Sequence, residues 1–279
     1  MYQKVIDANI AIYNTISKHY NTCEPHYRPE NISQVENKLK TIFKETGATK
    51  MLDLGCGTGF LINIAKKHLP YIDGVDVTPA MLEKVDKSGS AEINLYTSDT
   101  GTFAVKEANY DVVTAYSFLH HLYDIKPTCA TAFKALKKGG KFYNDLDPNF
   151  YYWEQINKLE REGNYHPIVK REIEMVTYKD EDIEKEFGVS KDDFNHAEFG
   201  KNIAGGFKEE MLRETLLAVG FSKVEIFYYW FLGQASIVNN PDSPKDENLK
   251  YAAVMDKTLQ SVLPLSRHLY KYLGFVATK

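Results

Sequence analysis

The sequence is poor in the features that mark secreted, membrane-spanning and nucleic-acid-binding chains. It has only 3 cysteines in 279 residues, at positions 23, 56 and 129. This odd, scattered set predicts neither a disulfide framework nor a zinc site, so we expect no metal and a reducing, cytoplasmic location. No apolar run approaches the roughly 18 residues that a membrane-spanning helix needs. The N-terminal stretch lacks the continuous apolar region of a signal peptide, so none is predicted.

An excess of positive charge is also missing. The formal net charge is −4 at pH 7, whereas proteins that hold nucleic acid rely on many lysine and arginine contacts to phosphate. Hydrophobic residues make up 43% and charged residues 26%, which is the composition of an ordinary globular chain. The length suits one elaborated domain or two small ones.

What the sequence does contain is an alternation of strand-like and helix-like segments. Such an alternation predicts an α/β fold, a doubly wound and mostly parallel sheet with helices on both faces. The segments expected to be strands span 51–54, 71–77, 93–99, 110–117, 141–146, 222–232 and 273–278. The helices expected between them span 60–69, 80–85, 127–136 and 209–220.

Four regions are predicted from this pattern: an N-terminal helical cap (1–45), a core (46–148), an inserted helical lid (149–206), and a segment (207–279) that completes the sheet and carries a helical insert at 240–270. Within the cap, Ser33 followed by Glu36 predicts a capping box at the start of the second helix. The lid is aromatic, then charged, and predicts two or three helices. Gly139 and Gly140 are expected to end the helix that begins at Pro127.

The stretch MLDLGCGTGF joins a strand to a helix through a turn with glycine at positions 55, 57 and 59. Glycines let a ligand approach the main chain closely, and open α/β sheets bind ligands at this edge. The dinucleotide fingerprint G-x-G-x-x-G needs its third glycine one place later, where this chain has Phe60. Asp76 ends the second strand, 21 residues after Gly55. NAD enzymes also carry an acid at this place, so Asp76 by itself does not identify the ligand.

At this point the motifs carry a family resemblance. LDLGCGTG, GVDVTPAML, SDTGTF, YDVVTAYSFLHHL, LKKGGKFYNDLDPN and AVGFSKVEIF resemble, in order and spacing, the successive motifs of class I S-adenosylmethionine-dependent methyltransferases. The resemblance covers residues about 46–148 and 207–238. It implies a seven-stranded Rossmann-like sheet, S-adenosyl-L-methionine as cofactor and S-adenosyl-L-homocysteine as product.

The resemblance also implies a set of cofactor-binding residues. The glycine turn would pass under the amino-acid end of the cofactor, with Asp53 shaping that environment, and Asp76 would hold the ribose. Tyr20 and Arg28 would clamp the methionine carboxylate, or else pack at the surface. The full set is Asp53, Gly55, Cys56, Gly57, Gly59, Asp76, Val77, Met81, Asp99, Thr100, Ser117, Tyr20 and Arg28. Tyr116 is expected near the methyl-donor end.

Three residues are candidates for a catalytic base, namely His121, His120 and Asp145. Histidine titrates near neutrality, but the resembling family carries LHHL in members with many different acceptors, so the pair can equally be structural. For Asp145 we prefer a buried strand-end hydrogen bond. A sulfonium donor is already activated, and a base is needed only when the acceptor must lose a proton. O-, N-, C- and S-methylation therefore stay open.

The expected acceptor is a small organic molecule that receives the methyl group by in-line displacement. Family members that methylate amino groups of DNA bases or protein glutamine carry (N/D)-P-P-(Y/F) after the fourth strand, and this chain has AYSFLHH there. The alternatives are an RNA (tRNA) methyltransferase, a non-catalytic S-adenosylmethionine-binding protein and, disfavoured by the glycine spacing, an NAD oxidoreductase. The sequence leaves a homodimer as one possible assembly. One or two of Tyr151, Trp153, Tyr228 and Trp230 are expected to line the acceptor pocket.

Overall fold

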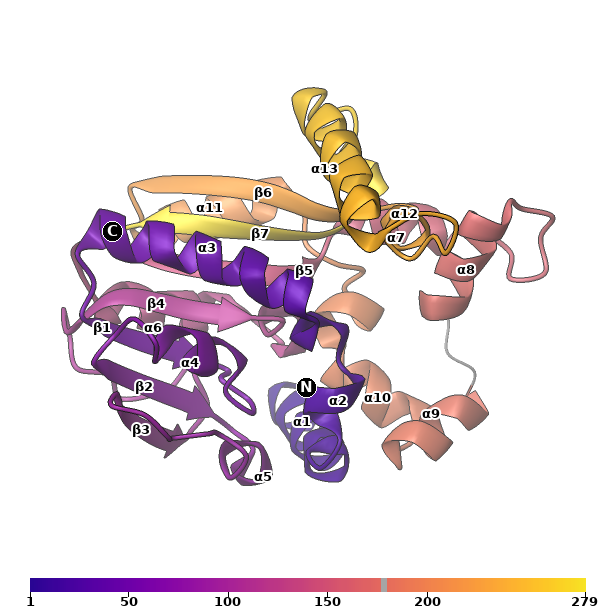
Figure 1. Ribbon diagram of the computed structural model, residues 1–279. Coiled ribbons are helices and arrows are strands. Elements are labelled where there is room, and N and C mark those ends of the chain that lie inside the picture. The colour runs from indigo at the N-terminus through magenta and orange to yellow at the C-terminus, as the bar shows by residue number, and fades with distance from the viewer. Residues whose placement is uncertain (177–179) are drawn as a thin grey trace.

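A computed structural model describes residues 1–176 and 180–279. Its centre is a seven-stranded sheet in the order β3-β2-β1-β4-β5-β7-β6 (Figure 1). All neighbouring strands are parallel except β7, which is antiparallel to both β5 and β6. The strands are β1 (Lys50–Leu54), β2 (Tyr71–Asp76), β3 (Glu92–Thr97), β4 (Tyr110–Tyr116), β5 (Leu136–Pro148), β6 (Lys223–Phe231) and β7 (Tyr270–Thr278). The predicted fold class, a doubly wound and mostly parallel sheet, is confirmed.

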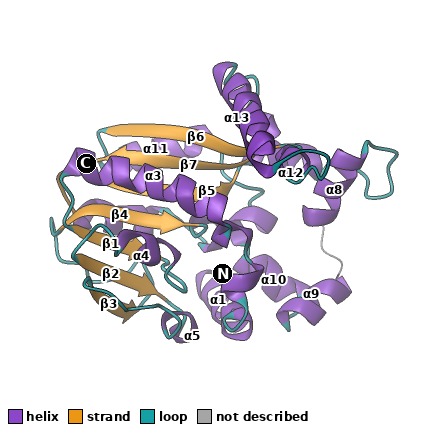
Figure 2. Ribbon diagram, viewed as in Figure 1, coloured by secondary structure: helices purple, strands orange, loops and turns teal. Residues whose placement is uncertain are grey.

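Helices cover both faces of this sheet, as Figure 2 shows. On one face, Val35 and Leu39 of α3 pack against Met51 and other buried residues of the strands. On the other face, Ala132 of α6 and Leu212 of α11 belong to the second large apolar cluster. The helices around the sheet are α3 (Pro29–Thr46), α4 (Phe60–Ala65), α5 (Pro79–Leu82), α6 (Lys126–Ala135), α11 (Glu209–Val219), α12 (Gln234–Val238) and α13 (Lys245–Ser261), with the short turns η2 (Leu119–His121) and η4 (Arg267–Leu269).

The strand order creates a crevice between β1 and β4. From β1 the chain runs outward through β2 to β3, and from β4 it runs in the opposite direction to β5. The loops that follow β1 and β4 therefore diverge, and open α/β sheets bind ligands at such a switch point. Every residue of β4 is buried, as expected of a central strand with both faces covered.

The N-terminal and inserted segments meet at this carboxyl edge of the sheet. Ala8 and Ile12 of α1 share an apolar cluster with Ile183, Phe194 and Ala197 of the insert, and Figure 1 shows α1 between the sheet edge and α10. The N-terminal elements are α1 (Tyr2–Ile16), α2 (Tyr20–Cys23) and η1 (Pro25–Tyr27). The insert contains α7 (Phe150–Ile156), α8 (Pro167–Val176), α9 (Asp180–Phe187), α10 (Lys191–Ala197) and the π-helical turn η3 (Phe199–Ile203).

Several local expectations were wrong. Helix α3 begins at Pro29, because a proline with fixed φ fits the first helical turn, so Ser33 lies inside the helix and is no capping box. Gly139 and Gly140 do not end α6. They lie inside β5 where its register with β4 shifts, and Gly139 has φ +79°. The insert holds more helices than the two or three expected, although residues 177–179 of the predicted 149–206 lid lie outside the described residues.

None of the helices in the described parts of the chain combines the length and the apolar character needed to cross a bilayer.

Candidate functional site

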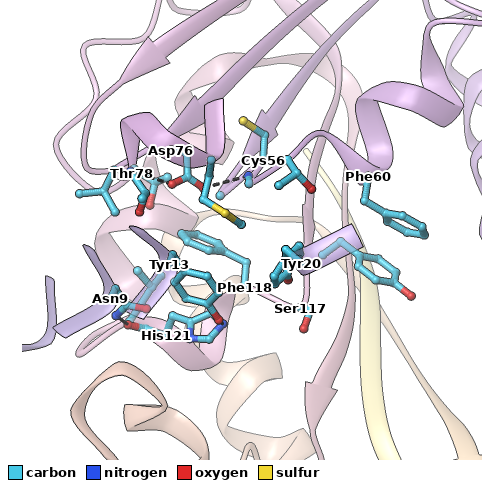
Figure 3. Close-up of a pocket in the computed structure, with 18 of the residues that line it drawn as sticks. Asn9, Tyr13, Tyr20, Cys56, Phe60, Asp76, Thr78, Ser117, Phe118 and His121 are labelled. Atoms are coloured by element: carbon cyan, nitrogen blue, oxygen red, sulfur yellow. Dashed lines mark hydrogen bonds between the residues drawn. The ribbon is translucent and has the colours of Figure 1, made fainter. Parts of the chain in front are cut away.

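A cavity lies at the carboxyl edge of the sheet, in the crevice between β1 and β4 (Figure 3). Its floor comes from the segments that follow β1, β2, β3 and β4, and its cover comes from the N-terminal segment. The lining residues are Ile6, Asn9, Tyr13, Tyr20, His26, Tyr27, Gly55, Cys56, Gly57, Thr58, Phe60, Asp76, Val77, Thr78, Met81, Ser98, Asp99, Thr100, Tyr116, Ser117, Phe118, His121 and Leu122. The cavity thus combines a glycine-rich floor with a cover rich in tyrosine.

The glycine turn presents its backbone to this cavity. Gly57 has φ +51°, and a Cβ atom built on it would meet only the Met81 Cε at 3.4 Å. The space beside Gly57 is therefore open, and its backbone conformation favours glycine. The Gly57 N–H donates to Asp76 Oδ2 over 2.9 Å. Gly55 and Cys56 also line the cavity, whereas Gly59 lies outside the lining as the residue that caps α4.

The Asp76 carboxylate accepts hydrogen bonds from two backbone N–H groups. Its Oδ1 accepts from Thr78 N at 2.8 Å and its Oδ2 from Gly57 N at 2.9 Å, and Figure 3 shows this carboxylate facing the cavity. Burial raises the pKa of Asp76, although the hydrogen bonds from Thr78 and Gly57 oppose the shift. Each carboxylate oxygen can accept two hydrogen bonds, so both retain a lone pair for a ligand.

Asp53 lies beneath the turn and does not line the cavity. It is buried and accepts from Thr114 Oγ1 at 2.7 Å. Burial raises the pKa of Asp53 to about 7. The hydrogen bond from Thr114 lowers this pKa, and the nearby charge of Asp76 raises it further. Any effect of Asp53 on a ligand therefore passes through the turn above it.

The segments after β2, β3 and β4 place most of the remaining predicted cofactor residues in the lining: Val77, Met81, Asp99, Thr100 and Ser117. Asp99 accepts from the Tyr2 hydroxyl and, at 2.6 Å, from Gly101 N. The Thr100 hydroxyl lies 2.8 Å from the Thr128 hydroxyl, so it points into the core. Ser117 has φ +50°, a strained conformation for a serine of the kind that gathers at functional sites.

The N-terminal cover supplies several lining residues that the sequence analysis missed, among them Asn9, Tyr13 and Tyr27. Tyr13, Tyr20 and Tyr27 recur at intervals of seven residues, and this spacing was the available signal. The Tyr27 hydroxyl lies 2.6 Å from the Thr58 hydroxyl of the glycine turn, which also donates to Asn21 Oδ1. Tyr20 lines the cavity as predicted, but Arg28 is exposed and outside the lining, so the structure does not pair them.

The three candidate bases differ in their access to the cavity, although the ring centroids of His120 and His121 lie only 4.0 Å apart. His121 lines the cavity, with its Nε2 atom 3.0 Å from the Tyr13 hydroxyl. His120 lies outside the lining, and its Nδ1 is 2.7 Å from Asp147 Oδ1. Asp145 is also outside the lining and is fully buried, where it accepts from the Tyr143 hydroxyl, Leu146 N and Lys38 Nζ. Its contacts match the structural hydrogen bonding that we preferred.

The aromatic runs expected at the acceptor pocket lie away from this cavity. None of Tyr151, Trp153, Tyr228 and Trp230 belongs to its lining. Trp153 packs with Tyr152 and Ile156 in the insert, and Tyr228 packs in the core beneath α11. The β6 run lies at the far edge of the sheet, where β5 and β7 separate it from β4 and its crevice. The aromatic residues at the cavity are Tyr13, Tyr20, His26, Tyr27, Phe60, Tyr116, Phe118 and His121.

The insert does not reach the cavity either. Among the described residues of 149–206 none lines it. The insert packs against α1 on the side away from the cavity. It contacts His120 and His121 through Ala197 and Glu198. His120, His121 and Glu198 bring ligand-type atoms within 4.8 Å of one another. These atoms are already engaged, since His121 Nδ1 bonds the Ala197 carbonyl and Lys201 pairs with Glu198.

The cavity fits an adenosyl cofactor with a charged amino-acid end. The open space beside Gly57, its N–H group and the Asp76 carboxylate are the features that a ribose-bearing ligand needs at a βα turn. Val77 and Met81 supply apolar contact beside them, and Asp99 follows the next strand. The residues that would hold the cofactor thus lie together on the floor of the cavity.

Residues 52–144 match the family model of a methyltransferase domain. The ubiquinone biosynthesis O-methyltransferase of Idiomarina loihiensis is 32% identical over 131 residues, which are 45% of this chain and 52% of that protein. Its namesake from Saccharophagus degradans is 27% identical over 152 residues, 52% of this chain and 64% of that protein. The chain spans about half the length of the curated relatives it matches.

Two solved structures extend the likeness to most of the chain. An S-adenosylmethionine-dependent methyltransferase from Mesorhizobium loti is 19% identical, with a TM-score of 0.54 over 87% of this chain and 96% of its own. One from Archaeoglobus fulgidus is 16% identical, with a TM-score of 0.50 over 89% and 94%. At such identities these likenesses show the fold. With the matched methyltransferase domain, they lead to one conclusion: residues 52–144 are a methyltransferase domain, and the chain around them has the fold of S-adenosylmethionine-dependent methyltransferases.

Proposed function

We propose that this protein transfers a methyl group from S-adenosyl-L-methionine to a small organic acceptor by in-line displacement. The observation that carries the proposal is the cavity itself, whose glycine floor and Asp76 face a cover of aromatic side chains. Concave sites lined by aromatic groups with a few placed polar atoms are typical of small ligands. The curated relatives are named as O-methyltransferases of ubiquinone biosynthesis, which supports a ring-bearing acceptor.

The residues divide into two roles. Asp76, which accepts from the Gly57 N–H, binds the ribose of the cofactor, with Val77, Met81 and Asp99 beside its base, and the glycine turn passes under the amino-acid end. The cover positions the acceptor and keeps water away, which is the main task when the donor is already activated. The bound cofactor supplies a methyl group on a positively charged sulfur. A cytoplasmic location and a homodimer stay predictions.

The test compares acceptors directly. Methyl transfer from labelled S-adenosyl-L-methionine is measured into a small-metabolite extract and into total RNA, with Asp76→Ala as the paired variant. We expect label in the small-metabolite fraction that is lost in the variant. Label in RNA alone, also lost in the variant, would support an RNA methyltransferase. Cofactor binding without transfer to either fraction would support a non-catalytic binding protein.

The N-terminal segment is expected to close over bound cofactor. The Tyr2 hydroxyl donates to Asp99, and Asn9 Nδ2 donates to the His121 carbonyl at 3.1 Å, so α1 is tied to the floor by side-chain contacts. A ligand held between the two should suppress opening. S-adenosyl-L-homocysteine at about 100 times its Kd should slow tryptic cleavage after exposed Lys18 by at least about tenfold. Cleavage after Lys257 on α13 is the internal control, and equal slowing at both sites would contradict local closure.

A further inference from the structure

Tyr13 of the N-terminal cover and His121, which follows β4, meet at the wall of the cavity. We propose that they form a proton relay in which His121 is the base and Tyr13 carries the proton to it, and that the acceptor is a hydroxyl compound. The inference rests on the proposed function and adds to it a residue on α1 and the chemical class of the acceptor. In Figure 3 the two side chains lie side by side at the cavity wall.

The hydrogen bonds of His121 determine its tautomer. Its Nδ1 lies 2.8 Å from the carbonyl oxygen of Ala197. A carbonyl oxygen only accepts, so Nδ1 carries the proton and Nε2 of the neutral ring has a free lone pair. Nε2 lies 3.0 Å from the Tyr13 hydroxyl, which therefore donates to it. The basic nitrogen is the one on the side of the cavity.

Both partners are fixed in place. Asn9 on α1 donates to the backbone carbonyl of His121 at 3.1 Å and to the Val5 carbonyl at 2.8 Å. The Tyr13 and His121 rings meet edge to face, with centroids 5.3 Å apart and planes at 85°. The Tyr13 oxygen donates once and keeps its lone pairs, so it can accept a hydroxyl proton from a molecule in the cavity.

The groups around His121 keep its ring neutral at pH 7. Burial and the neighbouring His120 lower the pKa of His121 to about 4, so the ring is neutral and able to accept a proton at pH 7. Burial opposes ionisation of Glu198, but Lys201 and the histidines hold its pKa at about 2, and its Oε1 lies 3.6 Å from His121 Nδ1. This carboxylate stabilises the imidazolium that forms when Nε2 takes a proton. The titratable groups that face His121 are Tyr13, His120, Asp147 and Glu198.

The proton balance requires an acceptor that gives up a proton as it is methylated. The acceptor O–H bond breaks, its electron pair becomes the new bond from oxygen to the methyl carbon, and the old carbon–sulfur pair stays on sulfur. The acceptor proton passes to the Tyr13 oxygen while the Tyr13 proton passes to His121 Nε2. A hydroxyl is a poor nucleophile until its proton is removed, and an amine that is protonated at pH 7 must lose a proton as well, so the relay serves either kind of acceptor. The relatives named as O-methyltransferases favour the hydroxyl.

The first test measures the protonation state of His121 in the absence of methyl transfer. Nitrogen-15 NMR of histidine-labelled wild-type protein at pH 7 should show His121 neutral and protonated on Nδ1, and the same tautomer should persist in Tyr13→Phe. The charged ring should appear only as the pH falls through about 4. Protonation on Nε2, or an imidazolium at pH 7, would overturn the proposal.

The second test uses carbon-13 methyl-labelled S-adenosyl-L-methionine and the small-metabolite extract. His121→Gln should lower methyl transfer at pH 7 by about 100-fold or more, the scale of a lost general base. The residual rate should rise with pH as the acceptor ionises in solution, whereas the wild-type rate should be flat above about pH 5. Tyr13→Phe should lose about tenfold or more. His68→Gln and Tyr151→Phe are matched controls outside the cavity. The carbon-13 shift of the product should identify an O-methyl group.

The outcomes separate the two proposals. If wild-type protein fails to bind S-adenosyl-L-homocysteine in calorimetry, the proposed function fails. If it binds the ligand and transfers methyl while both relay variants keep wild-type rates and pH profiles, only the relay fails. If the product carries an N-methyl group, only the assignment of a hydroxyl acceptor fails. Should His121→Gln not fold, Tyr13→Phe and the tautomer measurement still decide.

Discussion

Gly57→Val is expected to weaken S-adenosyl-L-homocysteine binding by at least about 100-fold while the protein stays folded. The Cβ atom of the new side chain would meet only Met81 Cε at 3.4 Å inside the protein, so we expect the valine to extend into the space that the ligand needs. The φ of +51° adds backbone strain of about 1–3 kcal/mol for a β-branched residue. Calorimetry with the ligand and denaturant unfolding measure the two effects separately.

Gly47, which ends α3, provides the control for the backbone strain that Gly57→Val introduces. Gly47 has φ +60°, and a Cβ atom there would meet nothing within 4 Å. Gly47→Val should therefore lose a similar free energy of unfolding but bind the ligand as the wild type does. Equal ligand affinity in Gly57→Val and Gly47→Val would show that the cofactor does not approach the backbone at this turn.

Asp76→Ala is expected to lower ligand affinity by roughly tenfold to 100-fold, because a charge-assisted contact contributes about 1.5–3 kcal/mol. The variant also leaves the Gly57 N–H without its hydrogen-bond acceptor. Since burial raises the pKa of Asp76, wild-type affinity should start to fall at a higher pH during acidification than an ordinary aspartate would allow. The variant should lose this dependence.

The matched control is Asp124→Ala. Asp124 Oδ1 accepts from Lys126 N at 2.9 Å, the same i to i+2 contact that Asp76 Oδ1 makes with Thr78 N at 2.8 Å. Both variants should lose this local contact, worth about 1 kcal/mol of stability, and only Asp76→Ala should lose ligand affinity. A change of less than twofold in Asp76→Ala would remove Asp76 from the cofactor site.

The floor of the site was largely predictable because its residues are close in sequence to strand ends. A glycine turn after a strand, or an acid at the end of the next one, has a local pattern, and parallel strands bring their carboxyl ends to one edge. The sequence alone therefore placed Gly57, Asp76 and Asp99 together. Gly59 was predicted beside them, but it follows the turn and caps α4 instead.

The cover was poorly predictable because it depends on contacts between distant segments. Tyr13 meets His121 across 108 residues, and nothing local to either marks the pairing. The aromatic run in β6 suggested a pocket wall by composition, but the sheet order places β6 at the far edge. Arg28 lies in the expected segment, yet α3 starts beside it and its side chain is exposed.

By itself, the sequence determined the alternating elements, the glycine turn and the acids that follow the strands, because periodicity and turn chemistry act over a few residues. Only the tertiary structure decided which histidine faces the cavity, which nitrogen of His121 is basic, and that α1 rather than the insert covers the site. Those outcomes depend on strand order and on the packing of α1 against α10, which join parts of the chain that no local pattern connects.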